Sequence, residues 1–64
     1  MKPGDPVETV FGDRGILEAF ESVVLPDRYG RPVDETAYWV RLLDGRLHLY
    51  LPGTVHPAHD QELQ

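Results

Sequence analysis

Cysteine is absent from this chain of 64 residues, and the absence removes several kinds of chemistry at once. Without thiols the protein has no disulfide, no thiolate zinc site and no cysteine nucleophile. Ser22 is its one serine, and no Gly-x-Ser-x-Gly segment surrounds it. Neither standard type of phosphate-binding glycine loop occurs in the sequence. We therefore predict no catalytic residues and no cofactor, and we expect a protein that is not an enzyme.

Basic residues are also scarce. Eleven acidic residues stand against six basic ones, which gives a net charge of −5, and Lys2 is the one lysine. Binding to nucleic acid depends on clustered Lys and Arg side chains that displace counterions from phosphates. The charge balance therefore disfavours a nucleic-acid partner, although the five arginines could still form a local basic patch. These arginines are Arg14, Arg28, Arg31, Arg41 and Arg46.

Long apolar segments are missing as well. No run approaches the roughly 18 residues that a membrane-spanning helix needs. The first six residues, Met-Lys-Pro-Gly-Asp-Pro, contain no apolar stretch of the kind found in a secretory signal. These features lead us to expect a cytoplasmic protein with no membrane partner.

The length predicts one small domain over residues 1–64. A chain of this size buries only about 60% of the surface that its unfolded form exposes, so its stability is marginal. Small domains compensate with disulfides, a structural metal or oligomerisation. With cysteine absent, we favour self-association. The packed part is expected at about residues 4–57, followed by a flexible tail over residues 58–64.

The remaining composition is typical of an all-β protein. Proline and glycine interrupt the sequence every few residues, and the segments between them are rich in Val, Leu, Tyr, Phe and Trp. We predict five strands, over Val7–Phe11, Ile16–Leu25, Ala37–Leu43 and Arg46–Leu51, with a short last strand at Val55. The apolar pattern of the second segment changes register within the segment, which predicts a β-bulge near Phe20–Ser22.

The turns between these strands differ in their chemistry. Asp44-Gly45 predicts a two-residue hairpin loop of type I′, and the segment Gly12–Gly15 predicts another tight reversal. The segment Pro26–Glu35 is predicted as a long loop that could project as a small hairpin around Tyr29-Gly30, because its prolines and charges oppose a central strand. At Pro52-Gly53-Thr54 we expect a tight turn, with at most a single 3₁₀ turn before the last strand.

Strict alternation in the fourth segment assigns its side chains to two faces. If the leucines point inward, the predicted core consists of Val7, Ile16, Val40, Leu42, Leu47, Leu49, Leu51 and Val55. A cluster of large polar and aromatic side chains then lies on the outer face and forms the predicted partner-binding site, which consists of Trp39, Arg41, His48 and Tyr50. Trp and Tyr are common anchors in protein interfaces. Two alternatives are open: Trp39 could cover an end of the barrel itself, or the register could be inverted.

Two further groups of residues are candidate sites. Arg28, Tyr29 and Arg31 on the long loop could hold an anion, with the tyrosine ring stacked on a base, although loops of this kind are usually only solvated. His56 and His59, followed by Asp60, have a spacing that could bind Zn²⁺ or Ni²⁺. Because no third fixed ligand is evident, we predict no resident metal there.

The order of these segments resembles the SH3-like small barrels, which include the KOW, Tudor and CarD-type modules. The likeness lies in Gly4-Asp5-Pro6-Val7 at the first strand, in the Tyr38–Leu42 and Asp44-Gly45-Arg46 hairpin, and in the closing turn Leu51–Val55. It covers roughly residues 4–57. The resemblance implies a five-stranded barrel that binds protein or nucleic acid, and small barrels of this kind serve many unrelated functions.

A narrower resemblance points to the type II dihydrofolate reductases, which are short SH3-like barrels active as tetramers. Their pore contains a Val-Gln-Ile-Tyr stretch just before a proline, and Leu47-His48-Leu49-Tyr50 before Leu51-Pro52 is similar in placement. Here His48 replaces the glutamine, and no lysine lies in the preceding strands. The sequence therefore leaves three hypotheses: a module that binds protein or itself, a nucleic-acid- or transcription-associated module, and a tetrameric reductase-like enzyme.

Overall fold

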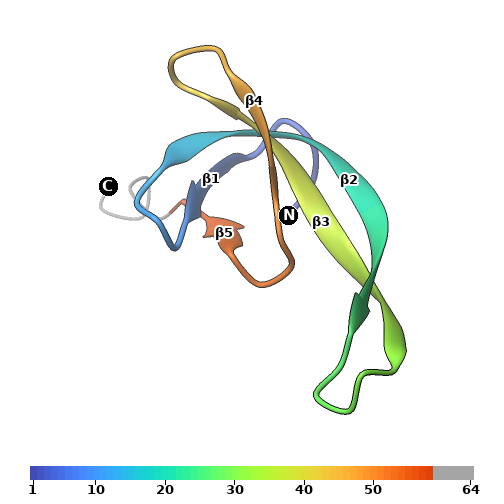
Figure 1. Cartoon of the computed structure of the whole chain (residues 1–64). Helices are drawn as coiled ribbons and strands as arrows, with labels where there is room; N and C mark the ends of the chain where they lie inside the picture. Colours follow the sequence, from blue (N-terminus) through green and yellow to red (C-terminus); the bar gives the residue numbers. More distant parts are fainter. Residues whose placement is uncertain (59–64) are drawn as a thin grey trace.

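A computed structural model describes residues 1–58 of the chain, and the five segments that it places in strands form one antiparallel sheet (Figure 1). The strands are β1 (Pro6–Thr9), β2 (Arg14–Pro26), β3 (Pro32–Leu42), β4 (Leu47–Tyr50) and β5 (Val55–Pro57). No helix occurs among these residues. The prediction of an all-β fold with five strands is confirmed.

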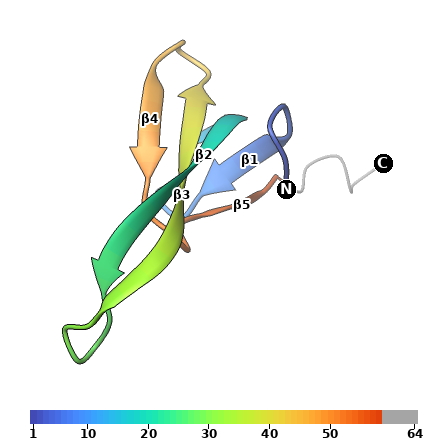
Figure 2. The ribbon, with the colours of Figure 1, turned by 90° about the vertical axis from the view of Figure 1, so that its right-hand side faces the viewer.

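The strands are arranged in the order β4-β3-β2-β1-β5. β2, β3 and β4 follow one another as a meander, and the chain then returns to place β5 beside β1. Figure 2 shows β1 and β5 running obliquely to the β3–β4 part of the sheet. β4 and β5 form the two edges and are not paired with each other, so the sheet is bent but not closed by hydrogen bonds into a barrel.

The β2–β3 hairpin is much longer than the other strand pairs. Its strands pair from Gly15 opposite Leu42 to Pro26 opposite Pro32, and its far half projects from the rest of the sheet (Figure 1). The predicted extent of the loop is therefore wrong, because Val33 to Glu35 belong to β3 and only residues 27–31 connect the strands, whereas the projecting hairpin predicted around Tyr29-Gly30 is confirmed. Pro26 and Pro32 lie at strand ends, where the lack of an N–H group is tolerated.

Three of the reversals share one geometry. Between β1 and β2, Gly12 N donates to Thr9 O (3.1 Å) and Thr9 N to Asp13 O (2.9 Å), and Gly12 has a φ of 90°. The same pair of hydrogen bonds spans residues 27–31 and residues 42–46, with a positive φ at the fourth residue, Gly30 or Gly45. This is the three-residue hairpin loop in which a type I turn precedes a glycine in the left-handed region.

The β3–β4 reversal therefore differs from the predicted type I′ turn. That turn needs a positive φ at both central residues, and all residues with a positive φ among residues 1–58 are glycines, so Asp44 does not have one. The loop gains Leu43 as a third residue, and Asp44 Oδ1 accepts a hydrogen bond from Arg46 N (3.0 Å). The positive φ predicted at Gly45 is confirmed at 94°.

Replacing Gly45 by valine tests this turn. A Cβ atom at Gly45 would meet no atom within 4 Å, so the cost comes from the backbone conformation alone. We expect the free energy of unfolding of Gly45→Val to fall by about 1–2 kcal/mol, as measured by urea denaturation. Gly45→Asn, which tolerates this conformation better, should recover part of the loss. Equal stability for Gly45→Val and wild type would contradict the positive φ.

A single apolar cluster holds the sheet together. It consists of Val7, Leu17, Val40, Leu42, Tyr50 and Val55, with Tyr38 packed against it. Four predicted core residues are therefore confirmed (Val7, Val40, Leu42 and Val55). The other four are wrong, since the exposed fraction is 40% for Ile16, 42% for Leu47, 40% for Leu49 and 58% for Leu51.

The length of the β3–β4 loop explains most of this difference. With a two-residue loop, Leu42 would lie opposite Leu47 and Val40 opposite Leu49. The three-residue loop shifts the register by one, so that Val40 pairs with His48 and Tyr38 with Tyr50. A shift of one residue exchanges the two faces of a strand. Tyr50 thus enters the core, and the leucines of β4 turn away from it.

The bulge and the C-terminal segment also differ from expectation. The β2–β3 register shifts between Leu17 and Ala19, upstream of the predicted bulge near Phe20–Ser22. Leu17 rather than Ile16 is fully buried. Ala58, which we expected to begin a flexible tail, is buried, and its N–H donates to Pro6 O (3.1 Å). The rest of that predicted tail lies outside the described residues.

Candidate interaction surface

The predicted partner-binding residues do not share one face. Paired residues of antiparallel strands lie on the same face, and β3–β4 pairs Trp39 with Leu49 and Arg41 with Leu47, but Val40 with His48. Trp39 and Arg41 therefore lie on the face opposite the core, which we call the outer face. His48 and Tyr50 lie on the core face with Val40. The prediction that these four side chains form one surface is wrong, because it depended on the incorrect β4 register.

The outer face combines two rows of side chains across β2, β3 and β4. In one row Ala19 pairs with Trp39 and Trp39 with Leu49, and in the other Ile16 pairs with Arg41 and Arg41 with Leu47. Ile16, Leu47 and Leu49 are each about two-fifths exposed, and Trp39 is half-buried. We call Ile16, Trp39, Arg41, Leu47 and Leu49 the outer patch. The three aliphatic members were not predicted from the sequence. For Leu47 and Leu49 the signal was the length of the β3–β4 loop, which sets the register of β4.

Polar contacts fix the two large members of the outer patch. Trp39 Nε1 donates to Glu21 Oε1 (2.7 Å). The guanidinium of Arg41 donates to Glu18 Oε2 (3.4 Å) and to Gly45 O (2.9 Å). Glu18 lies at the bulge of β2, between the paired residues Leu17 and Ala19. The arrangement holds an indole and a guanidinium in place among aliphatic side chains, a composition common at the centre of protein interfaces.

The core face carries a series of aromatic rings. Tyr50 stacks on Phe11 with 6.3 Å between ring centroids, and Phe20 contacts Tyr38 edge-on at 5.8 Å. His48 lies 6.3 Å from Tyr50. Tyr50 is buried, so of the two predicted contact residues on this face only His48 is exposed. Through these contacts the rings of Phe11, Phe20 and His48 pack against Tyr38 and Tyr50 at the margin of the apolar cluster.

Tyr50 is held by a hydrogen bond as well as by burial. Its hydroxyl donates to Asp13 Oδ2 (3.0 Å). Burial, followed by the hydrogen bond to Asp13, raises the pKa of Tyr50 above its ordinary value. The folded state therefore holds this proton more tightly than the unfolded state, so its contribution is complete below pH about 10 and is lost as the pH rises through the folded pKa.

Tyr50→Phe tests this contribution. The variant should lose about 0.5–1.5 kcal/mol of unfolding free energy near neutral pH, because the hydrogen bond is gone. The difference between wild type and variant should shrink above pH about 10, because the tyrosine of the unfolded state loses its proton there while the folded state still holds its own. Urea denaturation at several pH values measures both effects, and Tyr29→Phe, at an exposed tyrosine, is the control. A difference that stays constant with pH would contradict the raised pKa.

The predicted loop site is ordered around Asp27. Asp27 Oδ1 accepts hydrogen bonds from Tyr29 N (2.8 Å) and Arg31 N (2.9 Å). The guanidinium of Arg31 lies over the Tyr29 ring at 5.2 Å and pairs with Asp27 at 3.7 Å. Arg31 is thus already occupied by an acid and by the ring that was expected to stack on a base. Contact with an anion at Arg28, Tyr29 and Arg31 stays a prediction.

Arginine side chains elsewhere are also paired with acids. Arg14 pairs with Glu8 (3.2 Å), Arg41 with Glu18 (3.4 Å) and Arg46 with Asp44 (2.7 Å). Lys2 pairs with Asp5 (3.3 Å). Exposed ion pairs of this kind add little stability, but they reduce the positive potential available to a phosphate backbone.

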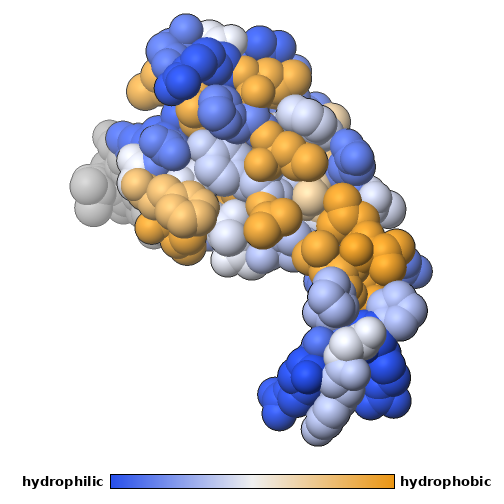
Figure 3. All heavy atoms as spheres, in the orientation of Figure 1, coloured by the Kyte–Doolittle hydropathy of each residue, from blue (hydrophilic) through white to orange (hydrophobic). Residues whose placement is uncertain are grey.

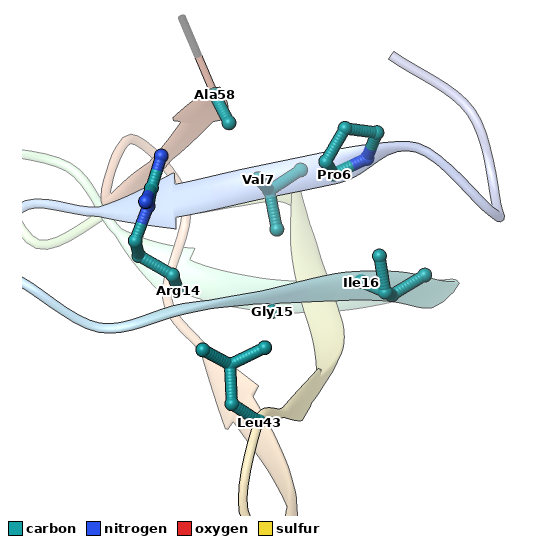
Figure 4. A pocket seen from close by; sticks show the side chains of 7 residues that line it. All are labelled: Pro6, Val7, Arg14, Gly15, Ile16, Leu43 and Ala58. Carbon is teal, nitrogen blue, oxygen red and sulfur yellow. The ribbon is translucent and has the colours of Figure 1, made fainter. Parts of the chain in front are cut away.

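A small hollow lies between β1, β2 and the β3–β4 turn (Figure 4). Its volume is about 150 Å³ and it is lined by Pro6, Val7, Arg14, Gly15, Ile16, Leu43 and Ala58. Sites for small organic ligands usually measure about 300–1,000 Å³. A more open hollow next to it has a volume of about 350 Å³ and is lined by Gly12, Asp13, Arg14, Leu42, Leu43, Asp44 and Arg46. Both of its arginines are paired with acids, Arg46 with Asp44 and Arg14 with Glu8.

The predicted metal ligands fall partly outside the described residues. His56 lies in β5, whereas His59 and Asp60 lie beyond residue 58. Within residues 1–58 no group of three His, Asp or Glu side chains is placed to hold a metal ion. In the same part of the chain there is also no helix with the length and apolarity to cross a membrane.

Comparison of the chain with protein-family models, with curated proteins and with solved structures finds no match.

Proposed function

We propose that the chain is a non-enzymatic module of SH3-like architecture that binds protein, either another chain or a second copy of itself, through the outer patch. The observation that supports this most strongly is the side-by-side arrangement of Trp39, Leu49, Arg41 and Leu47 on one sheet face, where Leu47 and Leu49 are each about two-fifths exposed. The single bent sheet of five antiparallel strands is compatible with a small β-barrel module and supports the architectural part of the proposal.

Several large apolar side chains in β4 and in the residues that flank it are exposed. Leu43, Leu47, Leu49 and Leu51 are 83%, 42%, 40% and 58% exposed. Figure 3 shows further hydrophobic residues gathered where the β2–β3 hairpin leaves the body, while its tip is hydrophilic. Contiguous apolar surface on a small domain usually marks a site of interaction.

The two competing hypotheses have weaker support. Binding to nucleic acid would need several arginines free on one face, and Arg14, Arg31, Arg41 and Arg46 each contact an acid. A reductase-like pore would need the Leu47–Tyr50 stretch to line it, and Tyr50 is buried and bonded to Asp13. We therefore do not propose either function.

Trp39→Ala is the direct test. We expect the wild type to bind a purified protein or itself with a measurable dissociation constant, and Trp39→Ala to weaken that binding at least tenfold, which is about 1.4 kcal/mol. Calorimetric titration and sedimentation velocity measure the two cases. Tyr29→Ala, a large exposed ring at the tip of the β2–β3 hairpin, is the matched control and should leave binding unchanged. Equal binding by the Trp39→Ala variant would contradict the proposed surface.

A further inference from the structure

β4, with four residues, is an edge of the sheet that carries neither proline nor charged side chains, two of the features that normally block edge-to-edge pairing. Natural proteins protect free edges with proline, charged side chains or very short strands. Residues 47–51 read Leu-His-Leu-Tyr-Leu and contain neither proline nor a carboxylate, lysine or arginine. β4 pairs with β3 on one side, and its other side is free within residues 1–58.

The other free edges of the sheet are protected. β5 has three residues and ends in Pro57. The projecting part of β3 has Pro32, Asp34 and Glu35 along its free edge, and the corresponding part of β2 has Glu18, Glu21 and Pro26. The contrast singles out β4 as the edge open to another strand.

The backbone groups of Leu47 and Leu49 point toward the open side. Leu42 N donates to Arg46 O (2.8 Å), so Arg46 forms a hydrogen-bonded pair with β3. In an antiparallel pair such residues alternate with residues whose N–H and C=O groups point away from the partner strand. His48 and Tyr50 therefore direct these groups to β3, whereas Leu47 and Leu49 direct theirs to the free edge.

The sequence of this edge is self-complementary. The residues on either side of Leu49 have aromatic side chains (His48 and Tyr50), and the residues two positions away on either side are leucines (Leu47 and Leu51). In an antiparallel pair centred on Leu49, each leucine would face a leucine and His48 would face Tyr50. Leu51 follows β4, and its carbonyl already accepts hydrogen bonds from Thr54 N (3.3 Å) and Thr54 Oγ1 (2.7 Å), so the hydrogen bonds between the two edges would centre on Leu49. No like charges would oppose each other, and a two-fold contact requires a surface that matches itself in this way.

We infer that β4 pairs with β4 of a second copy, antiparallel and centred on Leu49, so that two five-stranded sheets become one continuous sheet across a two-fold axis. The inference rests on the proposed function, since it names the partner and the mode of contact at the outer patch. The Trp39–Leu49 rows of the two copies would meet at the axis and bury the exposed leucines of β4. Addition of a strand at an open edge is an established mode of protein recognition.

The test replaces one outward hydrogen-bond donor by a methyl group. The 64-residue chain can be synthesised with N-methyl-leucine at position 49, which keeps the side chain and deletes an N–H that no residue of its own chain needs. We expect the wild type to form dimers with a measurable dissociation constant in sedimentation equilibrium, and the N-methyl protein to raise that constant at least tenfold. Circular dichroism should show an unchanged sheet in the N-methyl monomer.

Hydrogen exchange gives a second readout on unmodified protein. The Leu49 amide should exchange freely in dilute solution and become protected at concentrations where dimers form. The His48 and Tyr50 amides should be protected at both concentrations, since they bond to β3. Protection of Leu49 that does not depend on concentration would overturn the edge pairing, and so would a wild type that remains monomeric at millimolar concentration.

The outcomes separate this inference from the proposed function. If Trp39→Ala abolishes binding while N-methylation at Leu49 does not, the outer patch binds protein through side chains and the edge pairing is wrong. If N-methylation alone abolishes dimers, the edge pairing is right and the side chains of the outer patch are dispensable. If a purified foreign protein binds and no homodimer forms, the proposed function stands and the second copy is excluded as the partner.

Discussion

Leu17→Ala should lower the free energy of unfolding by about 2–5 kcal/mol, a large part of the roughly 5–15 kcal/mol typical of a small domain. Leu17 is completely buried and lies in β2 opposite Val40, at the centre of the apolar cluster. Its backbone also joins the N-terminal segment to the sheet, since Leu17 N donates to Asp5 O (3.0 Å) and Gly4 N to Leu17 O (2.8 Å). Urea denaturation of dilute protein measures the loss.

Leu49→Ala is the matched control for this prediction. The same atoms are removed, but from a side chain that is 40% exposed on the outer face. We expect a cost on the order of 1 kcal/mol or less in the monomer. If Leu49→Ala destabilised the dilute protein as much as Leu17→Ala, the leucines of β4 would belong to the core, and the β3–β4 register described above would be incorrect.

Gly15→Ala should lower the free energy of unfolding by about 1–3 kcal/mol or more, although it adds a single methyl group. Gly15 lies in β2 opposite Leu42, and a Cβ atom there would approach Arg41 O to 2.2 Å and Arg41 C to 2.9 Å. Both are backbone atoms, so β2 and β3 must move apart to accept it. Thermal and urea denaturation both measure the effect.

Ser22→Ala is a suitable control for Gly15→Ala, because Ser22 is an exposed residue of the same strand and should tolerate the change within about 0.5 kcal/mol. Wild-type stability in Gly15→Ala would mean that the strands are farther apart at this point than the structure has them. Gly15 differs in this respect from Gly45, where the backbone conformation and not space requires glycine.

The number of strands and their approximate positions along the chain could be predicted because the sequence signals for them are local. Glycine at a reversal and β-prone residues between reversals act over a few positions. The β2–β3 hairpin shows the limit of this reasoning. Pro32 and two acidic residues suggested a loop, but an edge strand with both sides open to water tolerates charges, and a strand end tolerates proline.

The faces of β4 could not be predicted, because leucines and large aromatic side chains alternate and either set could fill a core. The choice depended on whether the β3–β4 loop has two residues or three. Leu43 precedes Asp44-Gly45 and is 83% exposed in the loop. A leucine before Asp-Gly is equally typical of the last residue of a strand, so the sequence does not distinguish the two loop lengths. Trp39 and Arg41 were correctly predicted to share a face, because residues two apart on one strand do so whatever the loop length. The neighbours of these residues on β4, Leu47 and Leu49, depend on the loop length and were therefore not predicted.

The strand order also bears on how the chain reaches its fold. β1–β2, β2–β3 and β3–β4 each join neighbours along the chain, and closing such hairpins takes microseconds. Among residues 1–58 the β1–β5 pairing, with Val7 opposite Pro57, is the strand pair that links distant parts of the chain, and it carries the greatest loop-closure entropy. We therefore expect the meander from β1 to β4 to form early and the docking of β5 on β1 to complete folding. Until that step, β1 would present a second open edge, and newly made chains would be most prone to mispairing in this interval.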